Sequence, residues 1–240
     1  MKYAIIADIH GNLEAFQVVL EDIRAQKADH IVCLGDVVGY NANPKECLQI
    51  VREMNIPCVK GNHDEYCSSN SALEGFNPHA ADAVHWTREQ LSEEEKKWLR
   101  DLKYSRMVAN FTMVHATLDA PDRWGYVFDK LAAAASFPYQ NTQLCFFGHT
   151  HVPVAFMRDT VVRGGTYSKF KLDAAKKYFI NVGAVGQPRD NNPKAAYVIY
   201  DIDAQTIELR RLDYDIAAAQ KKIRDASLPE RLAERLAYGR

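Results

Sequence analysis

The sequence predicts an α/β protein with a mainly parallel sheet and a second, mixed or antiparallel sheet. Short apolar strands alternate with amphipathic helices over the first 60 residues, a pattern typical of βαβ units. Between residues 106 and 212, apolar runs follow one another closely enough to be hairpin neighbours, which indicates the second sheet. The 240 residues contain no internal repeat and no linker-like stretch, so we expect a single domain over 1–240.

Two helices separate the first three predicted strands. The strands are expected at 3–7, 31–34 and 57–60, where apolar runs end at a polar residue or a glycine. Asn12 can cap the first helix and Pro44 can begin the second, since apolar residues recur at helical spacing after both.

A helical insertion is expected at about 66–103. Asn77 and Pro78 open one of its helices, and Ser92 with Glu95 forms a capping box for the next. The segment is long enough to overhang the ends of the first strands. It would therefore either shape the choice of ligand or simply extend the core.

The rest of the chain is predicted to be strand-rich, with a helix at 125–135 and two amphipathic helices at about 214–240. Ser227 with Glu230 would cap the second of these terminal helices. The strands are expected at 106–109, 111–114, 144–147, 153–157, 161–163, 178–181, 196–200 and 206–212.

The composition excludes several classes of protein. Thirty basic residues against 31 acidic ones give a net charge of −1, which excludes a polycation built for nucleic acid or anionic membranes but leaves a local basic patch open. No apolar run approaches the roughly 20 residues of a membrane-spanning helix. A surface of almost no net charge permits self-association, so the sequence leaves a homo-oligomer open.

The cysteines favour a reducing compartment. There are five, an odd number for a disulfide framework, and Cys33, Cys58 and Cys145 lie in apolar strands where a buried free thiol is expected. Cys47 and Cys67 could be reactive, but the chain has no CxxC pair. We therefore expect a cytoplasmic protein.

Polar side chains with metal-binding atoms follow the predicted strands. Because the carboxyl ends of parallel strands meet at one edge of a sheet, these side chains should converge there. Two carboxylates, one amide and four imidazoles are the donors that two divalent cations require. These seven donors are Asp8, Asp36, Asn62, His10, His115, His149 and His151, and His63 and Asp64 directly follow Asn62.

Each of these motifs has an alternative interpretation when it stands alone. Gly61 to Asp64 consists of turn-forming residues, and Gly148 to His151 is as compatible with a surface turn as with a metal site. Their occurrence in order, each after an apolar strand, favours a common site. The absence of a GxSxG motif and of a P-loop argues against a seryl hydrolase and against a kinase or GTPase.

Five of these blocks together resemble the signature motifs of the calcineurin-like metallophosphoesterases. They are Asp8-x-His10, Gly35-Asp36, Gly61-Asn62-His63-Asp64, the lone His115 and Gly148-His149-x-His151. A looser block from Asn181-x-Gly183 to Pro188-Arg189 resembles the small prokaryotic phosphodiesterases of that superfamily. The resemblance implies two facing mixed β-sheets flanked by helices, an α/β sandwich.

The resemblance also implies a ligand set and two catalytic residues. His63 would protonate the leaving oxygen or bind the phosphate, and Asp64 would hold His63 or its loop in place. One metal would be bound by Asp8, His10, Asp36 and His151, and the other by Asp36, Asn62, His115 and His149.

The expected activity is hydrolysis of small phosphate esters by attack of a metal-bridging hydroxide. Two close divalent cations lower the pKa of a shared water and polarise the phosphoryl oxygens. Phosphodiesters are favoured slightly over phosphomonoesters or nucleotides. Mn²⁺ or Fe is favoured, and Zn²⁺, Ni²⁺ and Co²⁺ stay open. A non-catalytic metal-binding scaffold on the same fold is the rival interpretation.

Arg189 is the candidate for substrate binding, through a planar guanidinium that can clamp a phosphate. An ion pair with Asp190 or Asp201 is the alternative role for this side chain. The glycine-rich segment before it, Gly183 to Gly186, lacks the lysine of a nucleotide-binding loop and is expected to pass close to the site.

Overall fold

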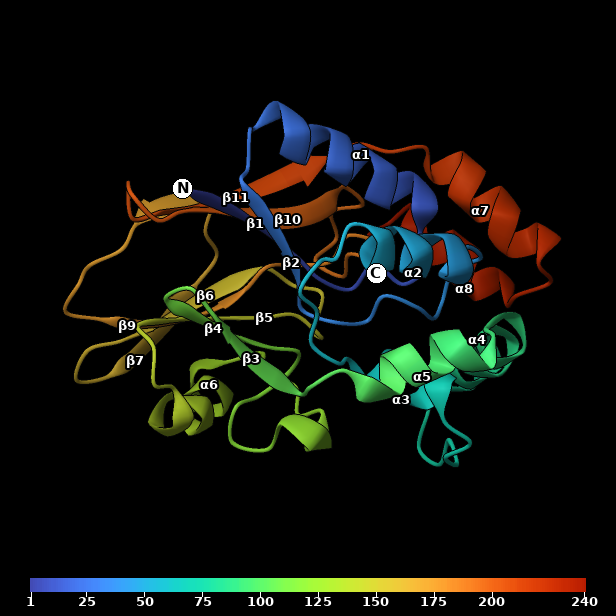
Figure 1. The fold of residues 1–240 in the computed structure, drawn as a ribbon, viewed down its shortest axis with the longest axis horizontal. Coiled ribbons are helices and arrows are strands. Elements are labelled where there is room, and N and C mark those ends of the chain that lie inside the picture. Colours follow the sequence, from blue (N-terminus) through green and yellow to red (C-terminus); the bar gives the residue numbers. More distant parts are fainter.

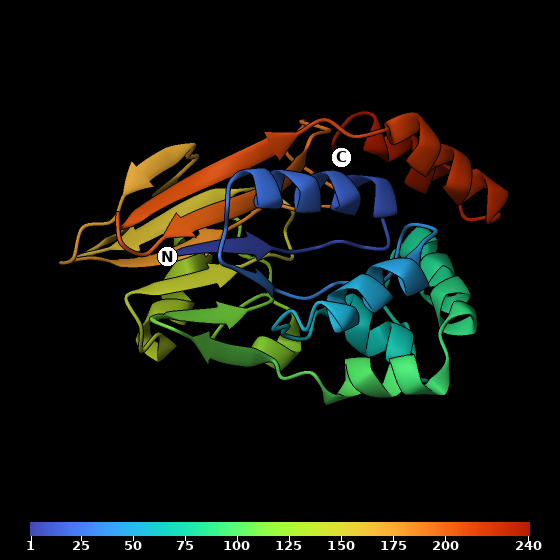
Figure 2. The same cartoon turned by 45° about the horizontal axis from the view of Figure 1, so that its top comes forward.

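Two β-sheets face one another in the computed structural model, which describes all 240 residues, and helices flank them (Figures 1 and 2). Ile5 and Val198 of one sheet and Phe146 and Ile180 of the other belong to the same buried cluster, which fills the space between the sheets. The predicted α/β sandwich of two facing mixed sheets is therefore confirmed.

The first sheet has five strands in the order β2, β1, β10, β11 and β8. Strands β1 and β2 are parallel, and every other neighbouring pair is antiparallel. The prediction of a mainly parallel sheet is therefore wrong, because β1 pairs on its other side with β10, which returns antiparallel from near the end of the chain. The strands span Lys2–Ile6 (β1), His30–Cys33 (β2), Lys169–Lys171 (β8), Ala195–Asp201 (β10) and Thr206–Leu212 (β11).

The second sheet has six strands in the order β3, β4, β5, β9, β6 and β7. Its central strands β4, β5 and β9 are parallel, and the outer pairs are antiparallel. The strands span Ser105–Val108 (β3), Phe111–Val114 (β4), Leu144–Phe147 (β5), Val154–Arg158 (β6), Val162–Gly165 (β7) and Lys177–Asn181 (β9).

Strand β1 shows how alternation of side chains builds the layers. Tyr3 and Ile5 point toward the second sheet, whereas Ala4 and Ile6 pack against Phe16 and its neighbours on the covering helix. The helices are α1 (Leu13–Ala25), α2 (Pro44–Glu53), α3 (Asn62–Ser68), α4 (Pro78–Gln90), α5 (Glu93–Asp101), α6 (Lys130–Ser136), α7 (Ile216–Asp225) and α8 (Glu230–Leu236). Two short 3₁₀ turns cover Pro121–Arg123 and Phe137–Tyr139.

The helix caps expected in the first hundred residues are present. Asn12 accepts the amide of Ala15 at 3.1 Å, and Asn77 accepts the amide of His79 at 3.0 Å. Ser92 and the Glu95 side chain form the reciprocal bonds of a capping box before α5.

Two predicted elements are corrected by the structure. Residues 57–60 form only isolated parallel bridges, because Cys58 faces Cys33 while Val59 already faces Lys103, so no ladder with one neighbour develops. The helix expected at 125–135 begins only at Lys130, since the Asp129 carboxylate accepts two amides of its first turn at 2.8 and 2.9 Å.

The terminal helix is also entered differently from the prediction. Pro229 precedes its first residue, and Glu230 forms an ion pair with Arg224 instead of a capping box. Ser227 has a φ of 56° and closes the end of α7, where its amide donates to the Arg224 carbonyl. Strand β8, a short edge strand, was not expected.

All five cysteines are free and buried. Burial raises the pKa of the Cys47 and Cys67 thiols, so both stay protonated, and neither is a reactive thiolate. None of the helices combines the length and the apolar composition needed to cross a lipid bilayer.

A half-buried ion pair links α1 to strand β11 of the first sheet. Arg210 of β11 donates to both carboxylate oxygens of Asp22 at 3.0 and 3.1 Å, and the Tyr197 hydroxyl donates to the same carboxylate at 2.7 Å. Burial alone would raise the pKa of Asp22, but these hydrogen bonds outweigh it and lower the pKa.

Asp22→Asn should therefore lower the free energy of unfolding by about 1–2 kcal/mol at pH 7. Because the folded pKa of Asp22 is depressed, its contribution is present above the unfolded pKa of about 4 and is lost as the pH falls through the folded pKa. Urea unfolding of both proteins at pH 7 and pH 3 measures this. A gap that stays equally wide at pH 3 would contradict the charge-based explanation.

Candidate metal centre

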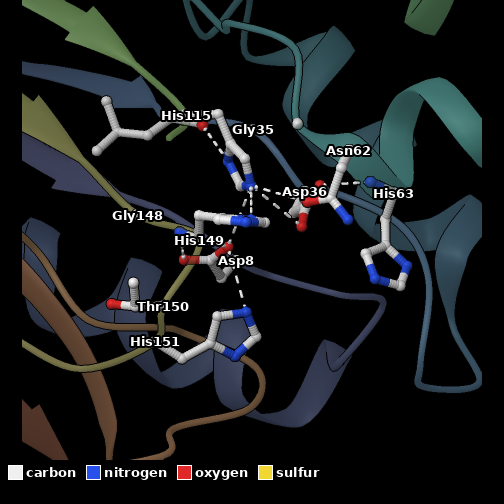
Figure 3. A network of polar contacts seen from close by, with 12 residues as sticks. Asp8, Gly35, Asp36, Asn62, His63, His115, Gly148, His149, Thr150 and His151 are labelled. Carbon is white, nitrogen blue, oxygen red and sulfur yellow. Dashed lines mark hydrogen bonds and ion pairs between the residues drawn. The ribbon is translucent and has the colours of Figure 1, made fainter. Parts of the chain in front are cut away.

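The predicted metal-binding side chains converge where the ends of two strand pairs meet (Figure 3). Asp8 and His10 follow β1 and Asp36 follows β2, and these strands are parallel neighbours in the first sheet. His115 follows β4, while His149 and His151 follow β5, its parallel neighbour in the second sheet. Residues from both sheets thus meet at one edge of the sandwich.

The donor atoms form two groups that share a carboxylate. Within each group all of the candidate ligand atoms lie within 4.8 Å of one another, and Asp36 belongs to both. All six of these side chains are buried. The groups are Asp8, His10, Asp36 and His151, and Asp36, His115 and His149.

Each of the four imidazoles is oriented by a main-chain carbonyl. A carbonyl can only accept, so the nitrogen beside it carries the proton and the other nitrogen presents its lone pair to the centre. The contacts are His10 Nδ1 to Val38 O at 3.0 Å, His115 Nδ1 to Leu34 O at 2.8 Å, His149 Nε2 to Trp124 O at 3.0 Å and His151 Nδ1 to Gln187 O at 2.6 Å.

The inward nitrogens are close enough to require a cation. His10 Nε2 lies 3.1 Å from His151 Nε2, and His149 Nδ1 lies 3.2 Å from His115 Nε2. Two lone pairs at such distances repel one another unless a proton or a metal ion lies near both. This donor set, four imidazole nitrogens and two carboxylates with no thiolate, fits divalent cations of the Mn²⁺ to Zn²⁺ series.

The protonation of the cluster shows the same demand for positive charge. Burial would lower the pKa of His115, but Asp36 and Asp8 outweigh it and raise that pKa to about 10. Burial lowers the pKa of His149 to about 3 and that of His10 well below its usual value. The two carboxylates thus favour a positive charge on the His115 ring, whose Nε2 lies 3.3 Å from Asp36 Oδ2 and 3.9 Å from Asp8 Oδ1.

The backbone is strained at five of these positions. Asp8, His10, Asp36, His149 and His151 all have φ between 48° and 67°, in the left-handed region that side chains other than glycine seldom adopt. Each such residue costs on the order of 1 kcal/mol, and concentrations of them are found at functional sites. The fold therefore holds these side chains in place at the expense of local stability.

Asn62 lies beside the second group, and its Oδ1 is 3.2 Å from His115 Nε2. It is the first residue of α3, so the turn considered for Gly61 to Asp64 is the N-terminus of a helix. Gly61 has to be a glycine there, because a Cβ would come within 2.0 Å of Asp36 Oδ1.

Asp64 acts on the loops that carry the ligands. Its carboxylate accepts the amides of Asp36, Val37 and Gly61 at 2.7, 2.9 and 3.0 Å, and it makes no hydrogen bond to the His63 ring. Burial, with the nearby charge of Asp36, raises the pKa of Asp64 to about 7. The side chain thus joins the loop after β2 to the start of α3.

His63 lies beside the cluster without belonging to either group. Its amide donates to Asp36 Oδ1 at 2.8 Å, and its ring packs on Tyr40 and His10 at centroid distances of 4.3 and 4.9 Å. His63 is 3% exposed, and its Nδ1 has no hydrogen-bond partner. Gly39, with a φ of 92°, makes room for it, since a Cβ there would lie 2.5 Å from Nδ1. Burial lowers the pKa of His63 to about 4.

Arg189 lies next to the cluster but forms neither of the ion pairs considered as alternatives. Its guanidinium donates to Gln187 Oε1 at 2.8 Å and lies 5.4 Å from the centre of the Tyr40 ring, while Asp190 pairs with Arg211. The glycine-rich loop runs behind the site, as expected, with the Gly186 amide donating to the Asp8 carbonyl at 2.9 Å.

Three aromatic residues at the site were not identified from the sequence as site residues. Tyr40 packs on His10 and His63, Tyr126 stacks on His149 at 4.3 Å, and Trp124 supplies the carbonyl that orients His149. Tyr40 and Trp124 also have positive φ values of 60° and 55°, which the residue pattern of the sequence does not reveal.

The chain belongs to the calcineurin-like phosphoesterase superfamily. The family model of the calcineurin-like phosphoesterase superfamily domain matches residues 1–205, which contain the six clustered donors together with Asn62, His63, Asp64 and Arg189. Proteins of this family are metal-dependent, and this chain has a buried cluster of Asp and His that can hold metal.

Relatives cover nearly the whole chain. The crystal structure of a metallophosphoesterase from Sphaerobacter thermophilus is 41% identical, with a TM-score of 0.89, over 100% of this chain and 99% of that one. An uncharacterized protein of Methanocaldococcus jannaschii is 39% identical over 99% of this chain and 98% of its own length. Phosphodiesterase YfcE of Escherichia coli is 25% identical over 86% of this chain and 91% of its own length. The protein is thus a hydrolase that acts on phosphate esters.

Proposed function

We propose that this protein is a dinuclear-metal phosphoesterase that favours phosphodiesters over phosphomonoesters. The observation that carries the proposal is Asp36, a buried carboxylate shared by two groups of inward-facing donors. A carboxylate in that position can bridge two cations, which is the arrangement that phosphoryl transfer with two metals requires.

The two groups define which residues would hold which ion. Each ion would be held by the donors of one group, with Asn62 added to the second because its oxygen lies beside His115. We favour Mn²⁺ or Fe for donors that are all nitrogen or oxygen, and Zn²⁺, Ni²⁺ and Co²⁺ suit the same donors. When bound, the cations would supply an activated water and polarise the phosphoryl oxygens.

The protein's own residues would complete the reaction. Burial lowers the pKa of His63 to about 4, so its ring is neutral near pH 7 in the free protein, and the negative charge of a bound phosphate would favour its imidazolium form. That imidazolium would transfer one proton to the departing ester oxygen and return to the neutral ring. The Arg189 guanidinium can bind a non-bridging phosphoryl oxygen, since neither Asp190 nor Asp201 pairs with it. Asp64 would position His63 and Asp36 through their loops, not through contact with substrate.

The preference for diesters is supported by the likeness to phosphodiesterase YfcE, which extends over 91% of that protein. The setting we propose for this activity is the cytoplasm, where the five free thiols would stay reduced. We also propose that residues 1–240 act as one domain with the helices of 66–103 as an insertion.

Hydrolysis of bis-p-nitrophenyl phosphate and of p-nitrophenyl phosphate tests the proposal. Protein reconstituted with Mn²⁺ should release p-nitrophenolate from both, faster from the diester, and EDTA should abolish both reactions. Metal analysis should give two equivalents. Protein that holds two equivalents of each of the five candidate metals in turn and cleaves neither ester would overturn the proposal, and faster cleavage of the monoester would overturn the diester preference.

A further inference from the structure

A strongly basic cavity of about 570 Å³ lies beside the metal centre. Four arginines line it, and no aspartate or glutamate does. Arg189 follows β9 in the chain, Arg231 and Arg235 belong to α8, and Arg240 lies beyond that helix. Tyr40 and Tyr126 form the part of the wall that faces the metal centre.

One tyrosine ring connects this cavity, which we call the arginine pocket, to the candidate metal ligands. The ring of Tyr40 lies 4.7 Å from that of His10, and the Arg189 guanidinium lies 5.4 Å from the Tyr40 ring. The main chain connects them too, since the Arg189 amide donates to the His151 carbonyl at 3.2 Å. A ligand of modest size can therefore reach the metal centre and the arginine pocket at once.

Side-chain carboxylates compensate little of the positive charge of the pocket. Arg189 and Arg240 donate to the side-chain amides of Gln187 and Asn191, and Arg235 donates to the main-chain oxygen of Arg240. Only Arg231 has a side-chain carboxylate within 4.0 Å, that of Glu234 at 3.7 Å. Burial and the charge of Arg189 lower the pKa of the Arg235 guanidinium to about 10. Like charges held together in this way are stabilised by an anion between them.

The pocket is held in shape by apolar packing beneath it. Leu232 and Leu236 of α8 belong to one buried cluster with Ala83 of α4, and Trp86 packs against that cluster. The insertion and the terminal helices thus meet at the pocket, where α4 and α8 lie near one another (Figure 1). Arg235, which is half-buried on this packed helix, loses little further freedom on binding, which favours an anion site there.

We propose that the arginine pocket binds a second phosphate group of the substrate, so that the preferred substrates are small esters that carry at least two phosphates. The proposal rests on the proposed function, since the first phosphate occupies the metal centre. Guanidinium groups match phosphate oxygens with paired hydrogen bonds, and several of them around one cavity suit a group of charge near −2. The faces of Tyr40 and Tyr126 would contact the organic part between the phosphates.

The double variant Arg235→Gln with Arg240→Gln tests the proposal by kinetics. Two diesters with the same leaving group are compared: thymidine 5′-(p-nitrophenyl phosphate) and the same ester with an additional 3′-phosphate. In the wild type kcat/KM should be at least about tenfold higher for the doubly phosphorylated ester, and in the variant this ratio should fall toward one. Arg163→Gln, at an exposed arginine of β7 that pairs with Asp159, is the control and should keep the ratio.

A binding experiment without metal gives a second readout. Inorganic tripolyphosphate is titrated into EDTA-treated protein by calorimetry, and its Kd should be about tenfold higher for the double variant than for the wild type and the control. Unfolding temperatures show whether the variants are folded. If the double variant with Arg235→Gln does not fold, the double variant Arg231→Gln with Arg240→Gln takes its place.

The outcomes separate this proposal from the proposed function. The kcat/KM ratio of the two diesters, or the affinity for tripolyphosphate, could be the same in the wild type and the double variant. Either result would overturn the arginine pocket as a phosphate site, while cleavage of both diesters would still support the proposed function. Binding that depends on the arginines without a kinetic preference would show an anion site that does not serve the substrate, and would also overturn the proposal. Failure to cleave either ester would count against the proposed function instead.

Discussion

Asp36→Asn should lower kcat by at least about 10³-fold and leave the purified protein with fewer than two equivalents of metal. An amide presents one neutral oxygen where the carboxylate presents two oxygens and a negative charge. Because Asp36 belongs to both groups of donors, the substitution weakens both cation sites, which no other single residue of the cluster would do. Metal analysis and turnover of bis-p-nitrophenyl phosphate measure the two effects.

Asp101→Asn is the matched control for this experiment. Asp101 is an exposed carboxylate on α5 that pairs with Lys97, so its loss should change neither metal content nor turnover. Circular dichroism and an unfolding temperature establish that the Asp36 variant is folded. A folded Asp36→Asn protein that keeps two metals and normal turnover would refute the shared-carboxylate arrangement.

His63→Gln should lower kcat by about 10²–10⁴-fold for esters with a poor leaving group, and by much less for p-nitrophenyl esters. A methyl ester needs a proton on its departing oxygen, whereas p-nitrophenolate leaves readily without one. Metal content should be unchanged, because the ring belongs to neither group of donors. The measurement is kcat for thymidine 5′-(p-nitrophenyl phosphate) and thymidine 5′-(methyl phosphate).

The same experiment distinguishes the two roles expected for this histidine. If the ring only binds the phosphate, KM rises and the two esters are affected equally, and a role as proton donor is then wrong. His85→Gln, at an exposed histidine of α4, is the control and should leave both rates unchanged. Glutamine fills more of the space above Gly39 than alanine would, which limits collapse of Tyr40 into the site.

Much of the metal centre could be predicted because side-chain chemistry and strand periodicity carry the information. Asp8 and His10, like His149 and His151, stand two residues apart after an apolar run, and the donor types are those that metal ions need. The structure brings these four together with Asp36 and His115. Helix caps such as Asn12 were predictable for the same reason, since the capping atom belongs to the side chain itself.

The parts that escaped prediction depend on main-chain atoms or on distant packing. The carbonyls of Val38 and Trp124 orient two imidazoles, and a carbonyl group has no sequence signature. Residues 57–60 read as a strand because local pattern does not reveal that Cys58 and Val59 face different neighbours. From the sequence, Arg235 is expected on the solvated face of an amphipathic helix. In the structure, the packing of α8 places it in the same cavity as Tyr40 and Arg189.

The origin of the ligands in both sheets has a consequence for how the protein responds to chelators. Three of the candidate ligands follow strands of the first sheet, and three follow strands of the second. Bound cations would therefore link the two sheets. The first three are Asp8, His10 and Asp36, and the others are His115, His149 and His151. Loss of the metal to a chelator would then require a transient separation of the two sheets. Removal of the metal should therefore be slow and steeply temperature-dependent. Without metal, the protein should exchange its amide hydrogens fastest in the loops that carry these ligands, where the two sheets meet.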